Sequence, residues 1–234
     1  MARIFAGTSG WAYASWKPAF YPPKTPSNQF LPYYATRLNS VELNYTFRRF
    51  ATPKLLDAWI AATPGDFRFS VKAHQNITHV KRLRESEEFT RSFLSSLEPL
   101  AQANRLGTIL FQLPPFLKSD LPLLESFLAT LPRDIAYTFE FRHESWFNDP
   151  VFDLLRRFNV ALCIAGSEKL ETPNVQTASF LYFRLRKPEY PPAEREALVA
   201  RLAAFEGDAY VYFKHEETPQ GAVYAEELLQ KLRT

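Results

Sequence analysis

Short runs in which hydrophobic and polar residues alternate recur along the whole chain. In FRFSVKAH (67–74), the aromatic and aliphatic side chains occupy one face of an extended chain, and Arg68, Ser70, Lys72 and His74 occupy the other. This pattern is typical of a β-strand. Eight strand-like runs are predicted in all, at residues 3–8, 41–46, 67–73, 108–113, 136–142, 160–165, 180–186 and 209–215, and several of them alternate in this way.

Helical patterns lie between most of the predicted strands. Hydrophobic residues recur at helical spacing over residues 52–63, 86–107, 121–132, 149–158, 193–207 and 221–232. The first of these opens on Thr52 as N-cap with Pro53 at the first helical position. The connection from 166 to 178 has no clear helix, so we expect a short or irregular element there.

Alternation of strand and helix through eight units implies parallel strands joined by helical crossovers. The number of units and the length of 234 residues fit a single α/β domain, a (β/α)₈ TIM barrel over residues 1–234. A doubly wound open sheet is the alternative, and the even distribution of the eight units favours closure.

Several predicted strands carry a polar face, which is unusual for parallel strands covered on both sides. In VELNYT (41–46) that face holds Glu42 and Asn44, and in the runs at 136–142 and 180–186 it holds Glu140 and Arg184. The opposite faces are hydrophobic and suited to packing under helices. We therefore expect the polar faces to point into the barrel lumen.

Composition narrows the class of protein only slightly. The formal net charge is +3, which permits an anionic partner without requiring one. The single cysteine, Cys163, excludes an internal disulfide and lies in the apolar run VALCIA, where we expect a buried thiol. No apolar run approaches the length of a membrane span, and the N-terminus reads as a first strand. A cytoplasmic protein without membrane contact is the expectation.

Five segments resemble the YecE-like family, domain of unknown function family 72. They are GTSGWAYASW…FYP (7–22), VELNYTF (41–47), FRFSVKA…ITH (67–79), LGTILFQLPPFL (106–117) and EFRHESWF (140–147). The matches run in order over nearly the whole chain. The resemblance implies a TIM-barrel fold, and the name of the family states that its biochemical role is not established.

The chain departs from the usual family pattern in three places. Lys17-Pro18-Ala19 follows Trp16 where a glycine is common; the seventh strand ends YFRLRK, where the family often has arginine, then histidine and glycine; and the eighth ends YFKHEE, where asparagines are common. Strands seven and eight often form the phosphate site of a TIM barrel, so these departures affect that part of the pocket.

Active sites of TIM barrels lie at the C-terminal ends of the strands, and this selects the candidate residues. The catalytic candidates are Glu42, Glu140 and His74. The ligand-binding candidates are Lys72, Arg142, Arg184, Lys214, Asn44, Gln112, Trp11, Tyr13, His143 and Trp146. An excess of cations over carboxylates in a concave site favours a small phosphorylated or carboxylated ligand.

Each candidate has a plainer interpretation that stays open. Glu42 and Glu140 act as acid and base, or they only neutralise Arg142 and Arg68. Lys72 is a nucleophile at a strand end, or it holds a phosphate. The aromatic first βα connection (8–27) forms a wall of the pocket, or it is a hydrophobic plug.

The cofactor is unknown, and a metal is conceivable but not favoured. His74, His143 and His215 with a glutamate offer ligands for zinc or manganese. No HxH or HExxH spacing supports such a site, so no metal ligand is assigned.

Three functions are consistent with this pattern. The first is an acid/base hydrolase, lyase or isomerase acting on a small anionic substrate. The second is a nucleic-acid-binding protein or nuclease, because basic rim residues are interleaved with Trp11, Trp16, Tyr45 and Trp146. Those basic residues are Arg48, Arg49, Lys81, Arg82, Arg84, Arg186 and Lys187. The third is a sensor that binds a ligand in the same pocket without turnover.

Overall fold

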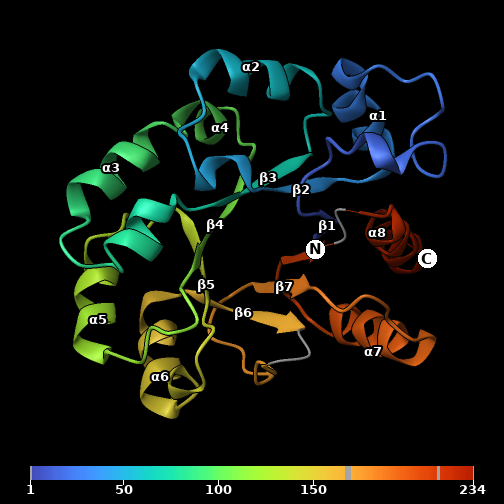
Figure 1. The fold of residues 1–234 in the computed structure, drawn as a ribbon. Coiled ribbons are helices and arrows are strands. Elements are labelled where there is room, and N and C mark those ends of the chain that lie inside the picture. The colour runs from blue at the N-terminus through green and yellow to red at the C-terminus, as the bar shows by residue number, and fades with distance from the viewer. Residues whose placement is uncertain (1, 167–169, 215–216, 234) are drawn as a thin grey trace.

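Eight parallel strands form a ring at the centre of the computed structural model, which describes residues 2–166, 170–214 and 217–233 (Figure 1). The strands are β1 Ile4–Thr8, β2 Ser40–Leu43, β3 Arg68–Lys72, β4 Leu106–Gln112, β5 Ala136–Glu140, β6 Ala161–Gly166, β7 Leu181–Leu185 and β8 Ala209–Phe213. Every predicted strand is present, with its ends shifted by a few residues at most.

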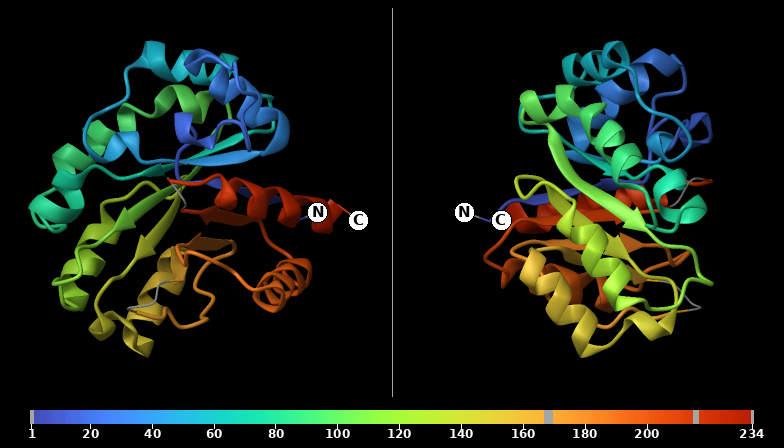
Figure 2. Two further views of the ribbon diagram at one scale, coloured as in Figure 1. Left: turned by 45° about the vertical axis from the view of Figure 1, so that its right-hand side comes forward. Right: turned by 90° about the vertical axis from the view of Figure 1, so that its left-hand side faces the viewer.

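The order of the strands shows that the sheet is a TIM barrel and excludes the doubly wound alternative. Each strand from β2 to β7 pairs in parallel with its successor, and β8 pairs in parallel with β1. The last junction, between β1 and β2, is closed by an isolated parallel bridge between Ser9 and Glu42. The two ends of the described chain therefore lie near each other on one side (Figure 2).

Side chains complete the junction between β1 and β2 where the backbone ladder is incomplete. The Asn39 amide donates to the Ile4 carbonyl at 2.8 Å and accepts from the Ala6 N–H at 2.8 Å. Gly7 is required here, because a Cβ added to it would lie 1.8 Å from the Ser40 carbonyl oxygen. The two strands thus approach more closely than any side chain at position 7 permits.

Helices surround the ring and agree with most of the predicted patterns (Figure 1). They are α1 Phe30–Arg37, α2 Pro53–Ala61, α3 Glu87–Ser95, α4 Glu98–Gln102, α5 Leu121–Ala129, α6 Asp149–Phe158, α7 Pro192–Ala203 and α8 Gln220–Arg233. Thr52 caps α2 by accepting from the Leu55 N–H, as its sequence indicates.

Two helical elements differ from the prediction. The pattern over 86–107 forms two helices, α3 and α4, with Pro99 in the first turn of the second, where a missing N–H costs no hydrogen bond. Helix α1 was not predicted, because it is short and contains Pro32. The β6–β7 connection has no helix within its described part, 170–178, in agreement with the irregular element expected there.

Shorter helical turns follow several strands. They are the 3₁₀ turns η1 Ala14–Trp16, η2 Ser27–Gln29, η3 Tyr45–Phe47 and η5 Glu144–Trp146, and the π-helical turn η4 Asn76–Val80. η3, η4 and η5 come directly after β2, β3 and β5 and shape the C-terminal end of the barrel.

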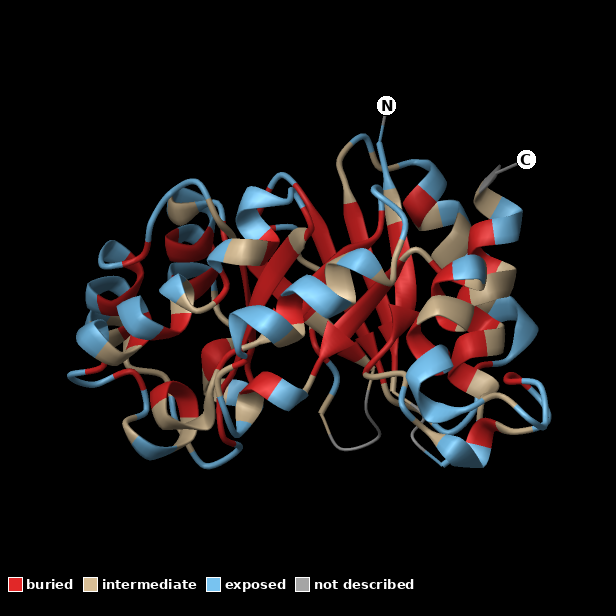
Figure 3. Cartoon of the chain, turned by 90° about the horizontal axis from the view of Figure 1, so that it is seen from above, coloured by how far each residue is buried: buried red, intermediate tan, exposed pale blue. Residues whose placement is uncertain are grey.

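The buried residues occupy the central strands and parts of the surrounding helices (Figure 3) and form two hydrophobic clusters. The larger hydrophobic cluster lies between strands and helices, and a smaller one, with Phe5, Leu110, Cys163, Tyr182 and Tyr212 among its members, fills the lumen. This division confirms that the alternate faces of the strands separate core from lumen. No helix of the described chain is long and apolar enough to cross a membrane.

Candidate functional site

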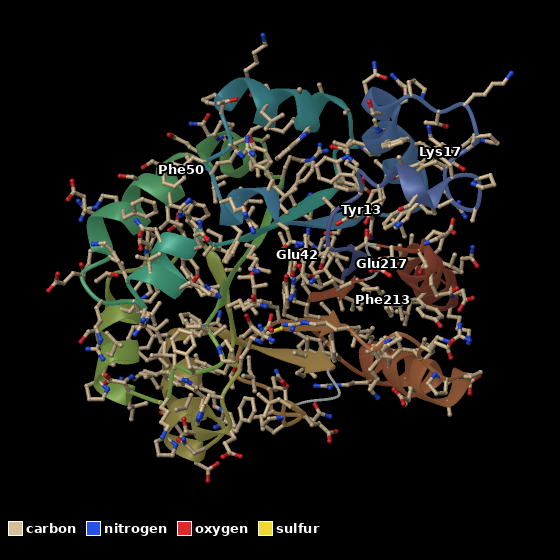
Figure 4. All side chains as sticks on the ribbon, in the orientation of Figure 1. Tyr13, Lys17, Glu42, Phe50, Phe213 and Glu217 are labelled. Atoms are coloured by element: carbon tan, nitrogen blue, oxygen red, sulfur yellow. The ribbon has the colours of Figure 1, made fainter. Side chains whose placement is uncertain are left out.

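Buried polar side chains from four strands meet at the C-terminal end of the barrel. Glu42, Gln112 and Glu140 lie in the last two positions of β2, β4 and β5, and Arg184 is the fourth residue of β7. All four side chains are buried. Glu42 lies near the middle of the ring of strands (Figure 4). The alternation of the strands turns these side chains inward, as the sequence predicts.

Both carboxylate oxygens of Glu42 are occupied by donors. Ser9 Oγ donates to one at 2.6 Å, Tyr182 Oη to the other at 2.5 Å, and Arg184 Nε lies 2.9 and 3.1 Å from the two. Burial alone would raise the pKa of Glu42, but the Arg184 charge and these hydrogen bonds outweigh it and lower the pKa below its ordinary value. Glu42 is therefore a fixed negative charge that orients Arg184.

Arg184 joins the two carboxylates into one cluster. Its Nη1 lies 3.4 Å from Glu140 Oε2, which also accepts from Gln112 Nε2 at 2.8 Å. Arg186 forms an ion pair with the other oxygen of Glu140. The carboxylates are thus paired with Arg184 and Arg186, and not with Arg142 and Arg68 as the plainer interpretation of the sequence assumed.

Arg68 lies at the opposite end of the barrel, at the first position of β3. Its guanidinium donates to the carbonyls of Asp66 and Phe67 at 3.1 and 3.3 Å and lies over the Phe5 ring. These backbone contacts replace the ion pair that the sequence suggested for it.

Lys72 borders the cluster from the end of β3. Its Nζ lies 4.0 Å from the centre of the Phe47 ring. Burial, with the nearby charges of Arg184, Lys214 and Arg186, lowers its pKa from 10.5 to about 7, and only Glu42 acts in the other direction. A pKa near neutrality is the range that suits a general acid or base.

Two cavities open beside the cluster and share Arg186. The smaller, about 270 Å³, is lined by Glu140, Arg142, His143 and Arg186 among others. The larger, about 770 Å³, lies at the ends of β7 and β8 and is lined by Arg186 and Lys214. A ligand in the smaller cavity meets Glu140 of the cluster, Glu144 and two arginines.

The structure does not bring His74 into this cluster. Its ring packs against Phe50 and Phe89, with centroids 5.6 and 5.1 Å away, and its Nδ1 accepts from the Asn76 N–H. Phe50 lies among the surrounding helices, away from Glu42 (Figure 4). The backbone leaves the strand after Lys72, so the alternation that assigned His74 to the lumen no longer applies.

The aromatic candidates support the site without lining it. Trp146 is fully buried, stacks on Phe141 at 4.6 Å and donates from Nε1 to the Leu117 carbonyl. Trp11 packs edge-on against Trp59 at 5.3 Å.

Two further candidates lie near the ends of β1 and β2. Tyr13 Oη donates to the carbonyl of Ser9, the residue whose hydroxyl donates to Glu42. Tyr13 therefore acts on the cluster through Ser9. Asn44 is half-buried at the start of η3, where it makes no side-chain capping bond.

Within the described ranges, no three His, Cys, Asp or Glu side chains gather as ligands for a metal ion. His143 Nδ1 is 2.9 Å from Ser145 Oγ. His215 lies outside the described residues.

Three residues of the cluster were not among the sequence candidates for the pocket. Arg186 follows Arg184 by two positions, so continuing the strand alternation past the end of β7 identifies it. Tyr182 precedes Arg184 by two positions, so the same alternation places it on the same face of β7. Ser9 follows β1 in the segment GTSGW, and no periodicity marks it.

Comparison with known proteins assigns the family. The family model "Protein of unknown function DUF72" matches residues 5–234. The UPF0759 protein YunF of Bacillus subtilis is 32% identical over 157 residues, which are 64% of this chain and 54% of YunF. The UPF0759 protein YecE of Escherichia coli K12 is 32% identical over 145 residues, 62% of this chain and 50% of YecE.

The chain spans about half the length of these curated relatives. A DUF72 family protein from Thermotoga maritima, known from its crystal structure, superimposes with a TM-score of 0.88 at 26% identity. The superposition covers 99% of this chain and 100% of that one. The sequence match and the shared barrel agree: this chain is a member of the DUF72 family.

Proposed function

We propose that this chain is an acid/base enzyme that binds a small phosphorylated or carboxylated molecule at the C-terminal end of its barrel. The observation that carries the proposal is the surplus of positive charge around Glu42 and Glu140. Four cations surround or border these two carboxylates, namely Lys72, Arg142, Arg184 and Arg186, and Glu144 also lines the smaller cavity. Positive charge in excess of the nearby negative charge is costly in a partly desolvated site, and an anionic ligand lowers that cost.

The contacts divide the roles among these residues. Glu42 holds Arg184 through two hydrogen bonds and does not line either cavity. Glu140 lines the smaller cavity together with Arg142 and Arg186. An anion entering there competes with Glu140 for Arg186 and frees one carboxylate oxygen. Glu140 then takes a proton from one atom of the ligand as a general base and returns it to another as a general acid.

Binding is tested by thermal unfolding with inorganic phosphate, sugar phosphates and 2-oxo acids. A ligand at one hundred times its dissociation constant adds about 2.7 kcal/mol to the unfolding free energy, which raises the midpoint by several degrees. We expect Arg142→Met to abolish the rise. Arg133→Met, which removes an exposed arginine before β5, is the matched control and leaves it intact.

Turnover is tested with the ligand that binds best. Proton movement at carbon appears as deuterium incorporation in heavy water, measured by NMR. Glu140→Gln removes the proton-transfer group, so we expect binding without incorporation. Binding by the unmodified protein without any chemical change selects the sensor instead. Failure of every anion to shift the midpoint contradicts the proposed pocket itself.

A further inference from the structure

Three large hydrophobic side chains are exposed in the described part of the chain, and all lie at the same end of the barrel. Tyr45 is 39% exposed, Val80 66% and Phe116 62%. They follow β2, β3 and β4, which pair side by side in the sheet. Adjacent loops therefore carry them over one sector of the rim (Figure 1). Clustered apolar exposure of this kind marks an interaction surface.

Contacts between these loops make the sector continuous. Phe47 of η3 packs edge-on against His79 of η4, with ring centroids 5.1 Å apart. The Arg82 guanidinium lies 5.1 Å from the centre of the Phe116 ring, and the Arg49 guanidinium lies 5.0 Å from that of Tyr45. We call the loop residues 44–50, 79–85 and 114–119 the β2–β4 rim.

The charged residues of the β2–β4 rim are mostly positive. Its sequence holds six cationic residues and one acidic residue, Glu85; the cations are Arg48, Arg49, Lys81, Arg82, Arg84 and Lys118. In the described part of the chain, Arg84 is the one member of this set that forms an ion pair, with Asp120. Positive charge of this density attracts a polyanion.

The turn that carries Arg82 is held in a strained backbone conformation. Arg82, Leu83 and Glu85 have φ values of +53°, +71° and +46°, in the left-handed region that non-glycine residues rarely adopt. Burial of Leu83 and the bond from its N–H to the Ile77 carbonyl, at 2.9 Å, hold the turn in place. Such strain is retained where it fixes a functional geometry, here the guanidinium over Phe116.

We propose that the β2–β4 rim binds single-stranded nucleic acid. Arg49 and Arg82 each cover one face of the exposed Tyr45 and Phe116 rings, and a base stacks on the exposed part of each ring while the arginines contact phosphates. A single strand presents both groups at once, whereas a duplex hides its base faces and an acidic peptide lacks flat rings at each unit. The surface is distinct from the pocket at Glu140, so the proposal does not depend on the proposed enzyme.

The test measures fluorescence anisotropy of labelled oligothymidine and oligouridine with the full chain. We expect binding that weakens roughly tenfold between about 50 and 200 mM salt. Tyr45→Ala and Phe116→Ala should each weaken binding by about tenfold, and Phe116→Trp should restore it. Arg82→Ala should reduce the slope of log affinity against log salt by about one.

The matched control is Arg133→Ala. Arg133 is also an exposed arginine over an aromatic ring, 4.2 Å from the centre of Phe158, but it precedes β5 at the opposite end of the barrel. We expect the Arg133→Ala variant to bind the oligonucleotides as the unmodified protein does. Every variant should unfold at an unchanged thermal midpoint.

Several outcomes overturn the proposal. They are no binding at low salt, equal affinity for duplex DNA or for polyglutamate, and an effect of Arg133→Ala as large as that of Arg82→Ala.

Discussion

Lys72 shows at the scale of a single residue how function and stability oppose each other. Its ammonium group is surrounded mainly by other cations and is partly removed from water, which lowers its pKa to about 7. A charge held this way destabilises the folded chain wherever it stays protonated. Residues kept at a cost in stability are typical of binding and catalytic sites.

Replacing Lys72 should therefore stabilise the protein in a pH-dependent way. Below about pH 7 the ammonium is charged in both states, so the folded state bears its full cost. Between pH 7 and 10.5 the unfolded chain binds the extra proton and the cost shrinks as pH rises. We expect Lys72→Met to raise the unfolding free energy by roughly 1–3 kcal/mol at pH 6 and by much less at pH 10.

Urea unfolding at the two pH values measures this difference. Lys54→Met, at an exposed position of α2, is the control and should change the unfolding free energy little at either pH. A gain that is equal at pH 6 and pH 10 would show that packing over Phe47, and not the charge, is responsible.

At the scale of elements, the strands followed from alternation and the junction between β1 and β2 did not. Eight short runs, either alternating or, as at 160–165, apolar throughout, formed eight strands because both patterns are typical of strands in a covered sheet. Helix α1 was missed because eight residues with an internal proline carry a weak periodic signal. The side-chain closure through Asn39 involves residues far apart in sequence, which no local pattern reveals.

The junction makes Gly7 and Gly65 a matched pair for substitution. A methyl group at Gly7 would collide with the Ser40 carbonyl at 1.8 Å, whereas at Gly65 it would meet nothing within 4 Å. We expect Gly7→Ala to lower the unfolding free energy by about 3 kcal/mol or more and Gly65→Ala to change it by less than about 1 kcal/mol. Chemical unfolding of both variants checks this, and equal effects would contradict the closed junction.

At the scale of the whole molecule, one buried ion-pair cluster connects distant parts of the chain. Glu42 of β2, Glu140 of β5 and Arg184 of β7 meet in the lumen although up to 142 positions separate them. Each charge compensates another, so removing one partner leaves an unpaired charge in a buried site.

Low pH should weaken this ion-pair cluster. The pKa of Glu42 is lower in the folded chain than its ordinary 4.5, so its contribution is present above that pH and is lost as pH falls below it. We expect the unfolding free energy to drop below about pH 4.5. Glu42→Gln should cost about 3–5 kcal/mol at pH 7 and flatten the acid limb.

Arg184→Met and the double variant Glu42→Gln/Arg184→Met, together with Glu42→Gln, form a double-mutant cycle. Because the two side chains interact directly, the double variant should lose less than the two single losses combined. Calorimetry or urea unfolding measures the coupling free energy between Glu42 and Arg184. Purely additive losses of unfolding free energy would contradict a direct interaction between them.

The sequence by itself determined the barrel and the inward direction of Glu42, Glu140, Arg184 and Gln112. Both depend on local periodicity, which fixes the face of a strand on which each side chain lies. Only the tertiary structure decided which charges pair, that His74 packs outside the lumen, and that Tyr45, Val80 and Phe116 share one rim. Those facts depend on the exact residue at which a strand ends and on distances between residues far apart in the chain, which local patterns do not determine.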